Sequence, residues 1–181
     1  SPRQRGLSCG GVMALAFDLS RAGIDGGNMH ERIATAKAEG RNLLEHEAWA
    51  LFGAYGIPVP RCRLAKTEEE AVRFAAEIGY PVVLKIVSPD ILHKSDAGGV
   101  KVNLADEQSV RNAYTGILKN VYAYRQSAWL EGILVSEMLP TGLETIIGMT
   151  QDVSFGPAFM FGLGGIFVEV LRDVSFRVLP L

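Results

Sequence analysis

One loop of the sequence, Ser88 to Gly99, brings together a histidine, a lysine and a carboxylate without helical or strand periodicity. The imidazole of His93 is the most versatile of these groups, because neutral imidazole accepts a phosphoryl group well near pH 7. Asp96 could hold the other ring nitrogen, and Lys94 could offset the charge of a phosphate. A solvated histidine in a turn is the alternative interpretation, and the loop alone leaves both open.

A second unusual residue is Lys85, which lies near the end of the apolar run Val82 to Ile86. Burying an unpaired ammonium group among Val, Leu and Ile costs on the order of several kcal/mol, or removes its proton. A lysine at this position therefore predicts an anionic ligand. The alternative is a lysine whose charged end reaches water where the strand ends.

A glycine-rich turn later in the chain contains Gly162, Gly164 and Gly165 between two apolar segments. Glycine lets backbone N–H groups approach an anion closely. The turn does not match the dinucleotide fingerprint, because Phe167 stands where the third glycine is needed and no helix is predicted after it. A tight structural hairpin is the alternative.

Two carboxylates, Glu137 and Glu144, flank the connection Met138 to Leu143 between two predicted strands. Carboxylates beside backbone donors and acceptors suit an adenine edge and ribose hydroxyls. Ordinary exposed glutamates are the alternative interpretation.

The elements that would position these residues begin near Met29. We expect a helix over about 30–39 and then a second helix that ends at Gly56, before Pro58. Thr67 and Glu70 form a capping box for a third helix. The apolar face of the second helix is expected to be Leu44, Ala48, Leu51 and Tyr55, and that of the third Ala71, Phe74, Ala75 and Ile78.

Strands dominate the second half of the chain, after a helix capped by Asp106. That helix is expected to bury Val110, Ala113, Tyr114, Ile117 and Val121. Two strands, Val82–Ile86 and Val100–Leu104, are expected before this helix. The strands expected after it are Ile133–Met138, Glu144–Met149, Ala158–Phe161, Ile166–Val170 and Val174–Val178. Helices alternating with strands, followed by strands alone, predict an α/β (α+β) fold of two lobes with a ligand cleft between them.

The composition is that of a globular protein, with 181 residues, 48% of them hydrophobic and 21% charged. The net charge is −2 and no basic run occurs, so we expect no nucleic-acid partner. Cys9 and Cys62 lack metal-binding spacing. The uncharged stretch Val153 to Val168 is too short and too rich in glycine for a membrane span. We therefore expect a cytoplasmic protein without a membrane partner.

These motifs occur in an order that is similar to a known family. They are Ile57–Pro60, Gly79–Lys85, His93–Asp96, Gly98–Lys101, and Phe155–Pro157 before Gly162–Gly165. The sequence resembles the ATP-grasp (beta-type) subunit or domain of NDP-forming acyl-CoA synthetases, relatives of succinyl-CoA synthetase, over about residues 29–181. The resemblance implies the ATP-grasp fold with its nucleotide between the lobes. Residues 1–28 are expected to be a leader or linker of uncertain origin.

The resemblance also implies an activity. Members of the family are acid–CoA ligases (ADP-forming). They convert acyl-CoA, ADP and phosphate reversibly into the free acid, CoA and ATP, and the phosphoryl group is passed through a phosphohistidine relay. A CoA-binding alpha-type subunit or domain carries the primary phosphohistidine, and we expect it as the partner in a hetero-oligomer. His93 is then the second carrier, which passes the phosphoryl group to ADP.

The nucleotide-contacting residues follow from the same resemblance. Lys85 is expected to bind the nucleotide phosphates, and Glu144 to approach the ribose. The other expected positions are Val135, Ser136 and Glu137 in an adenine-contacting hinge, Gly164 and Gly165 near the transferred phosphate, and Glu169 and Asp173 as weaker candidates.

The metal site of the family is expected outside this sequence. The Mg²⁺ ligands of the family lie beyond the glycine-rich hairpin, at positions that would follow Leu181. The resemblance therefore names no metal ligand among the 181 residues. We expect a domain that is incomplete at its C-terminal end and does not turn over alone.

Two other functions remain open at this point. An ATP-grasp ligase that works through an acyl-phosphate needs no histidine at position 93. A non-catalytic nucleotide- or acyl-CoA-sensing module fused to a protein acetyltransferase would need no turnover at all. The sequence leaves open the acyl group, the choice of ADP or GDP, and the stoichiometry.

Overall fold

The structure is a computed structural model that describes residues 29–164 and 174–178. Its contacts divide the chain into two units, with the boundary between Leu139 and Pro140. The helices are α1 (Met29–Ala38), α2 (Glu45–Ala54), α3 (Glu68–Ile78) and α4 (Glu107–Tyr124). The strands are β1 (Cys62–Ala65), β2 (Val82–Val87), β3 (Val100–Leu104), β4 (Gly132–Glu137), β5 (Thr145–Asp152), β6 (Gly156–Leu163) and β7 (Val174–Val178).

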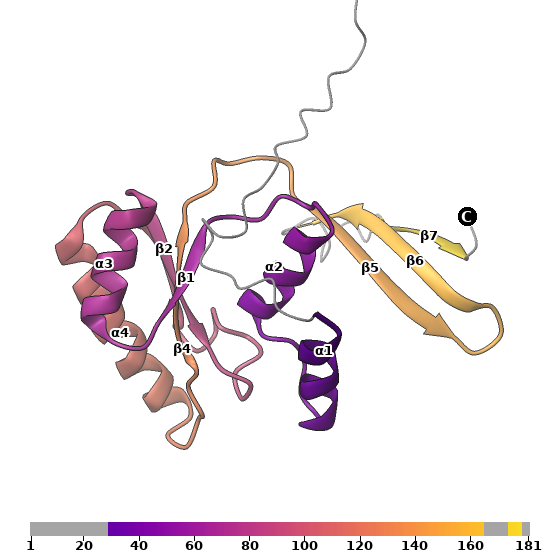
Figure 1. The fold of residues 1–181 in the computed structure, drawn as a ribbon, viewed down its shortest axis with the longest axis horizontal. Coiled ribbons are helices and arrows are strands. Elements are labelled where there is room, and N and C mark those ends of the chain that lie inside the picture. The colour runs from indigo at the N-terminus through magenta and orange to yellow at the C-terminus, as the bar shows by residue number, and fades with distance from the viewer. Residues whose placement is uncertain (1–28, 165–173, 179–181) are drawn as a thin grey trace, which may run out of the picture. The chain divides into compact units, whose positions relative to one another are not determined.

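The first unit is built on a four-stranded sheet in the order β1-β4-β2-β3, with every neighbouring pair antiparallel. Helices α3 and α4 cover one face of this sheet, and α2 lies on the other (Figure 1). Because side chains alternate along a strand, Val82, Leu84 and Ile86 enter the core under α3 and α4. Lys85 therefore faces the side of α2.

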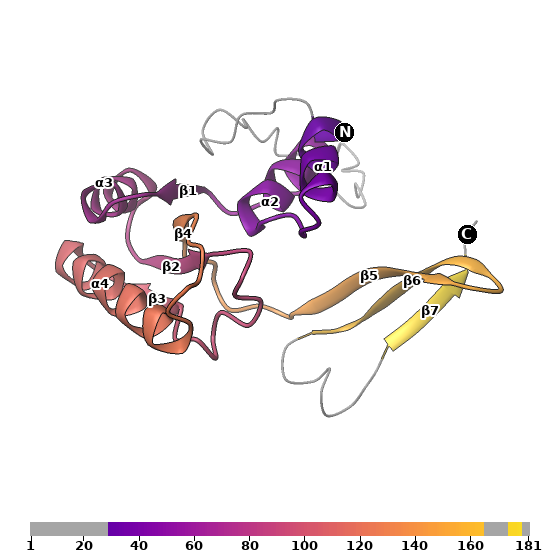
Figure 2. The ribbon, with the colours of Figure 1, turned by 90° about the horizontal axis from the view of Figure 1, so that it is seen from below.

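Helices α3 and α4 pack as their sequence patterns predict. The four expected apolar residues of α3 and the five of α4 are all buried. The hydroxyl of Thr67 accepts a hydrogen bond from the Glu70 N–H at 3.2 Å, as expected for an N-cap. The carboxylate of Glu70 accepts from the N–H of Lys66 at 2.8 Å, one residue before the cap. Figure 2 shows the two helices side by side.

Helix α2 differs from its prediction. Tyr55 lies just past its end and is 76% exposed, whereas Ala50 and Gly53 are buried. On this face of the sheet Cys62, Val87 and Leu134 form a small core, against which Leu44, Trp49 and Leu64 pack. Burial raises the pKa of the Cys62 thiol to about 12, as expected for a thiol packed in this small core.

The second unit is an antiparallel meander, β5-β6-β7. The turn between β5 and β6 is fixed by Asp152, whose Oδ1 accepts from the N–H groups of Ser154 at 2.8 Å and Phe155 at 2.9 Å. The chain enters β6 through Gly156 at φ +78°, which favours glycine. The predicted strand Ile166–Val170 and the predicted leader, residues 1–28, lie outside the described residues.

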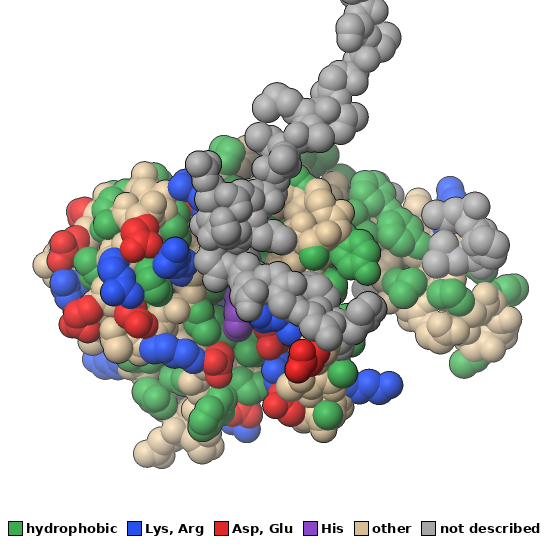
Figure 3. Space-filling model, viewed as in Figure 1, with side chains coloured by type: hydrophobic (Ala, Val, Ile, Leu, Met, Phe, Trp, Pro, Cys, Tyr) green, Lys and Arg blue, Asp and Glu red, His purple; other side chains and the backbone are tan. Residues whose placement is uncertain are grey.

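Acidic and basic side chains are interspersed over α3 and α4 on the face seen in Figure 3. Arg111 of α4, for example, pairs with Glu68 of α3 and with Glu107, each at 2.8 Å. In the described part of the chain, no helix is long and apolar enough to cross a membrane.

Candidate nucleotide and phosphoryl-transfer site

Lys85 is held by helix α2. Its Nζ donates to Oε1 of Glu45 at 2.7 Å and lies 5.2 Å from the centre of the Trp49 ring. Glu45 and Trp49 are four residues apart on a helix, so both side chains point to the same side. The side chain of Lys85 is 28% exposed. The structure thus gives Lys85 an internal carboxylate as its anionic partner.

The loop between β2 and β3 has a fixed base. Ile91 and Ala97 are each 3% exposed and belong to the core under α3 and α4. The hydroxyl of Ser88 donates to the carbonyl of Trp129 at 2.6 Å, and the N–H of Trp129 donates to Oδ2 of Asp90 at 2.7 Å. Only the residues between the two apolar anchors form an exposed tip.

His93 lies on that tip, and its side chain is exposed. Asp96 is exposed as well, and among the described residues no hydrogen bond joins it to His93. The expected pairing of the two therefore stays a prediction. An imidazole in this position is open to a phosphoryl donor from outside the unit.

The glycines after the tip are required by close packing. Gly98 has φ +63°, and a Cβ added there would lie 2.7 Å from Nδ2 of Asn120. A Cβ on Gly99 would lie 2.5 Å from Cγ2 of Ile86. The glycine pair therefore lets the end of the loop pack against α4 and β2.

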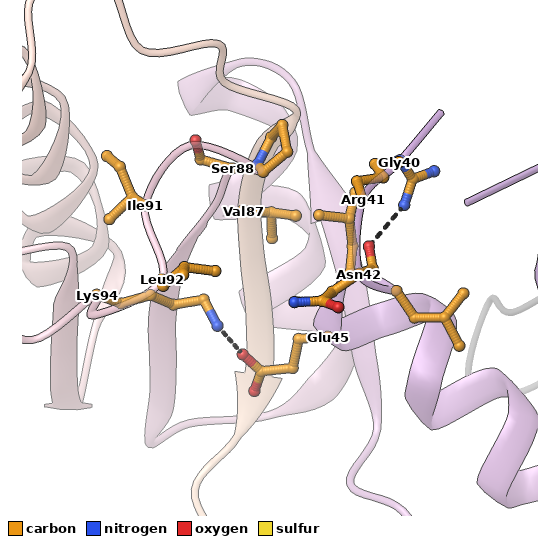
Figure 4. A pocket seen from close by; sticks show the side chains of 12 residues that line it. Gly40, Arg41, Asn42, Glu45, Val87, Ser88, Ile91, Leu92 and Lys94 are labelled. Carbon is orange, nitrogen blue, oxygen red and sulfur yellow. Dashed lines mark hydrogen bonds and ion pairs between the residues drawn. The ribbon is translucent and has the colours of Figure 1, made fainter. Parts of the chain in front are cut away.

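Lys94 connects the tip to the same carboxylate. Its Nζ donates to Oε2 of Glu45 at 2.8 Å, as Figure 4 shows. Burial raises the pKa of Glu45, but the hydrogen bonds and charges of Lys85 and Lys94 outweigh this effect and leave the pKa below its ordinary value. The carboxylate is therefore ionised at neutral pH, and the three charges leave one net positive charge.

A pocket of about 310 Å³ opens beside this cluster. Its walls are the segment Gly40–Glu45 and residues between Val87 and Lys94, which face each other in Figure 4. Arg41 in the wall is itself paired with Glu47 at 2.8 Å. The pocket thus lies between the start of α2 and the base of the histidine loop.

The expected adenine hinge lies on β4, the central strand between β1 and β2. Val135 and Ser136 are buried, at 0% and 2% exposure. Glu137 ends the strand, and its carboxylate accepts two hydrogen bonds from Arg61, each at 2.9 Å. Exposed positions follow at once, with Leu139 at 58%. The adenine contact of these residues stays a prediction.

In the second unit the structure brings Glu144 and Gly164 together. The N–H of Gly164 donates to the carbonyl of Glu144 at 2.8 Å. The side chain of Glu144 is exposed. Gly165, Glu169 and Asp173 lie outside the described residues. The ligand cleft that the sequence predicts between the two lobes depends on how the two units are placed, so it stays a prediction.

A metal site is not found in the described part of the chain. Within residues 29–164 and 174–178, no group of three or more His, Cys, Asp or Glu side chains is arranged to hold a metal ion. The Mg²⁺ ligands of the family are expected after Leu181, and Leu181 itself lies outside the described residues. The position of those ligands therefore stays a prediction.

Glu45 is a site residue that the sequence motifs do not include. The signal for it is its spacing of four residues from Trp49 on the same helix. His46, the residue after Glu45, has a buried Nδ1 without a hydrogen-bond partner among the described residues.

A family model for the ATP-grasp domain matches residues 35–181. The chain belongs to the ATP-grasp family.

Known relatives of this ATP-grasp chain are ADP-forming ligases. The chain is 57% identical over 151 residues to the beta subunit of acetate–CoA ligase (ADP-forming) I of Pyrococcus furiosus, covering 83% of this chain and 65% of that subunit. It thus spans less than two thirds of that relative's length.

Solved structures of one enzyme are also similar to the chain. The dinucleotide forming acetyl-coenzyme A synthetase 1 of Ca. Korarchaeum cryptofilum, in complex with coenzyme A, Ca-AMPCP and HgCl⁺, has a TM-score of 0.81 at 58% identity, over 85% of this chain and 68% of that one. A second structure of it, with coenzyme A and Mg-AMPPCP, has its phosphohistidine segment pointing towards the nucleotide binding site. Its TM-score is 0.70 at 53% identity, over 85% and 65% of the two chains.

Proposed function

We propose that this chain is the nucleotide-binding part of an acid–CoA ligase (ADP-forming). The observation that carries the proposal is the convergence of two predicted functional segments on one carboxylate. Lys85 of β2 and Lys94 of the histidine loop both contact Glu45. The exposed imidazole next to Lys94 therefore belongs to the same region as the lysine proposed for the nucleotide phosphates. The similarity to ADP-forming ligases supports the same function.

The proposed chemistry is two successive phosphoryl transfers. A ring nitrogen of His93 attacks the phosphorus of a phosphohistidine on the CoA-binding partner, and the P–N bond to the partner's imidazole breaks. A terminal phosphate oxygen of ADP then attacks the same phosphorus, and the P–N bond to His93 breaks to give ATP. Phosphoryl transfer depends on alignment and on stabilisation of charge, which the lysines supply.

The remaining residues have supporting roles in this proposal. Asp96 orients the imidazole once the loop moves, and Glu144 approaches the ribose. Val135 and Ser136 are buried, so they act by fixing β4, while Glu137 and the exposed residues after it face the adenine. Gly164 and Gly165 lie near the transferred phosphate.

Mg²⁺ and CoA belong to other parts of the proposed enzyme. When bound, Mg²⁺ would neutralise charge on the nucleotide phosphates. The described residues do not form a site for it, so no step here is assigned to the metal. CoA is bound by the alpha-type partner. The use of ADP, ATP and CoA favours action in the cytoplasm.

Replacement of the histidine tests the proposal. We expect His93→Asn, in the full-length protein with its partner, to abolish ATP formation from acyl-CoA, ADP and phosphate. His46→Asn, which changes the chain's histidine on α2, is the matched control and retains turnover. Normal turnover in His93→Asn would instead favour a ligase that uses an acyl-phosphate.

A further inference from the structure

Glu45 has no role in the chemistry above, yet it is the group on which both lysines converge. Its two carboxylate oxygens are divided between them, with Oε1 on Lys85 and Oε2 on Lys94. The side chain is 17% exposed, so solvent screens these contacts less than it screens a surface pair. In shape and charge the carboxylate resembles one edge of a phosphate group, with two oxygens that accept from two cations.

We propose that Glu45 is a positioning residue that occupies the phosphate-binding lysines while no phosphate is present and thereby latches the tip of the histidine loop. The inference rests on the proposed function, because it assigns Lys85 and Lys94 to phosphate groups. Phosphate on the nucleotide or on His93 competes with Glu45 for the two ammonium groups. Binding of phosphate then releases Lys94 from α2 and frees the tip.

The latch contact lies on a short tip whose two ends, Ile91 and Ala97, are anchored in the core. Within the loop, the N–H of Gly99 donates to the carbonyl of Lys94 at 2.8 Å, so the tip is otherwise held by local backbone hydrogen bonds. Of the described ion pairs, the one from Lys94 to Glu45 is the pair that connects this tip to α2. The ion pairs of the latch are weak, because the side chains of Lys85 and Lys94 are 28% and 26% exposed and water screens their charges. A carrier that visits more than one site must be held weakly in each.

The charges predict how a variant behaves. Glu45→Gln removes the competing anion and raises the net charge of the cluster from +1 to +2. We expect the affinity for ADP to rise by about three- to tenfold, since each unit charge at about 5–8 Å in a partly solvated site contributes on this order. The amides of Ala97, Gly98 and Gly99 donate to carbonyls of the tip, so they should exchange with solvent faster when the tip is released, while those of α3 and α4 keep their rates.

The experiment measures ADP binding by calorimetry and hydrogen exchange by mass spectrometry in the full-length protein with its partner. Glu47→Gln is the matched control, because Glu47 is a carboxylate of the same helical turn that pairs with Arg41. Glutamine also retains its capping hydrogen bond to the Leu44 N–H. Glu47→Gln should match the wild type in ADP affinity and in exchange of the loop. Lys94→Gln breaks the latch from the other side, so it should speed exchange of the loop without raising ADP affinity.

The outcomes separate the latch from the proposed function. Tighter ADP binding in Glu45→Gln, with faster exchange of the loop in both latch variants, supports the inference. ADP affinity in Glu45→Gln equal to or weaker than that of the wild type overturns the latch and leaves the ligase proposal intact. Absence of ADP binding in the wild type overturns the ligase proposal, and the latch with it. If Glu45→Gln does not fold, unchanged loop exchange in Lys94→Gln is sufficient to overturn the latch.

Discussion

The backbone of Gly164 lies against the backbone of Glu144. The N–H of Gly164 donates to the carbonyl of Glu144 at 2.8 Å. A Cβ at position 164 would lie 3.1 Å from the carbonyl carbon of Glu144 and from the nitrogen of Thr145. This contact extends the pairing of β5 with β6 by one hydrogen bond. Glycine is needed at position 164 because the two backbones approach too closely for a side chain, and not because of a left-handed backbone conformation.

Gly164→Ala should therefore push β5 and β6 apart at this end. We expect a loss of about 1–3 kcal/mol in the stability of the second unit, with faster amide exchange at Thr145 and weaker ADP binding. Gly142→Ala is the control, because among the described residues no atom apart from those of its chain neighbours lies within 4 Å of a Cβ at that position. Equal stability of the two variants would show that the close approach has no energetic consequence.

Replacement of Lys85 should weaken nucleotide binding directly. Loss of a charge-assisted hydrogen bond to phosphate corresponds to about a 10- to 100-fold loss of ADP affinity for Lys85→Met. The exposed Lys101, on the neighbouring strand β3, provides the control variant Lys101→Met. An unchanged ADP affinity in Lys85→Met would remove this lysine from the site.

Trp49 gives a second readout of the same site. Because its ring lies 5.2 Å from Nζ of Lys85, its fluorescence should change when ADP draws the lysine away. The other tryptophan, Trp129, is 67% exposed, and its fluorescence should not respond to ADP. The variant Trp49→Phe measures the fluorescence of Trp129 alone. A fluorescence change that persists in Trp49→Phe would assign the signal to another region.

His46 should make stability depend on pH. Burial lowers the pKa of its imidazole, and the positive charges of Arg32 and Lys66 add to this against the opposing effect of Glu47 and Glu131. A depressed pKa means that the unfolded chain binds the proton more tightly. The stabilising contribution is therefore complete above the ordinary histidine pKa and is lost as the pH falls below it.

Thermal unfolding of the wild type and of His46→Leu between about pH 7.5 and 5.5 measures this contribution. The wild type should lose stability more steeply than the variant on acidification, by less than about 1 kcal/mol per pH unit because the ring is only partly buried. Parallel curves for the two proteins would contradict the assignment.

The sequence was most informative where one local rule decides the structure. Strand Val100–Leu104, strand Val174–Val178 and the five buried residues of α4 agree with the structure, because hydrophobic periodicity depends on short-range geometry. It was least informative for α2. That helix buries few residues and uses Glu45 and Trp49 to hold a lysine forty positions away. No periodicity encodes a contact of that range.

The histidine loop also has one part that the sequence predicts and one part that it does not. The residue types at His93 and Lys94 suggested phosphate chemistry, whereas the anchors Ile91 and Ala97 could not be recognised inside an aperiodic segment. Their burial depends on the packing of α4 against the sheet, which sequence spacing does not specify.

The most direct measurement is the position of a labelled phosphate. The full-length protein and its CoA-binding partner are incubated with acyl-CoA and labelled inorganic phosphate, without ADP, and then quenched and mapped by mass spectrometry. We expect acid-labile, base-stable label on His93 of this chain, which disappears when ADP is added and is absent in His93→Asn. Label that is confined to the partner would contradict the role of His93 as carrier.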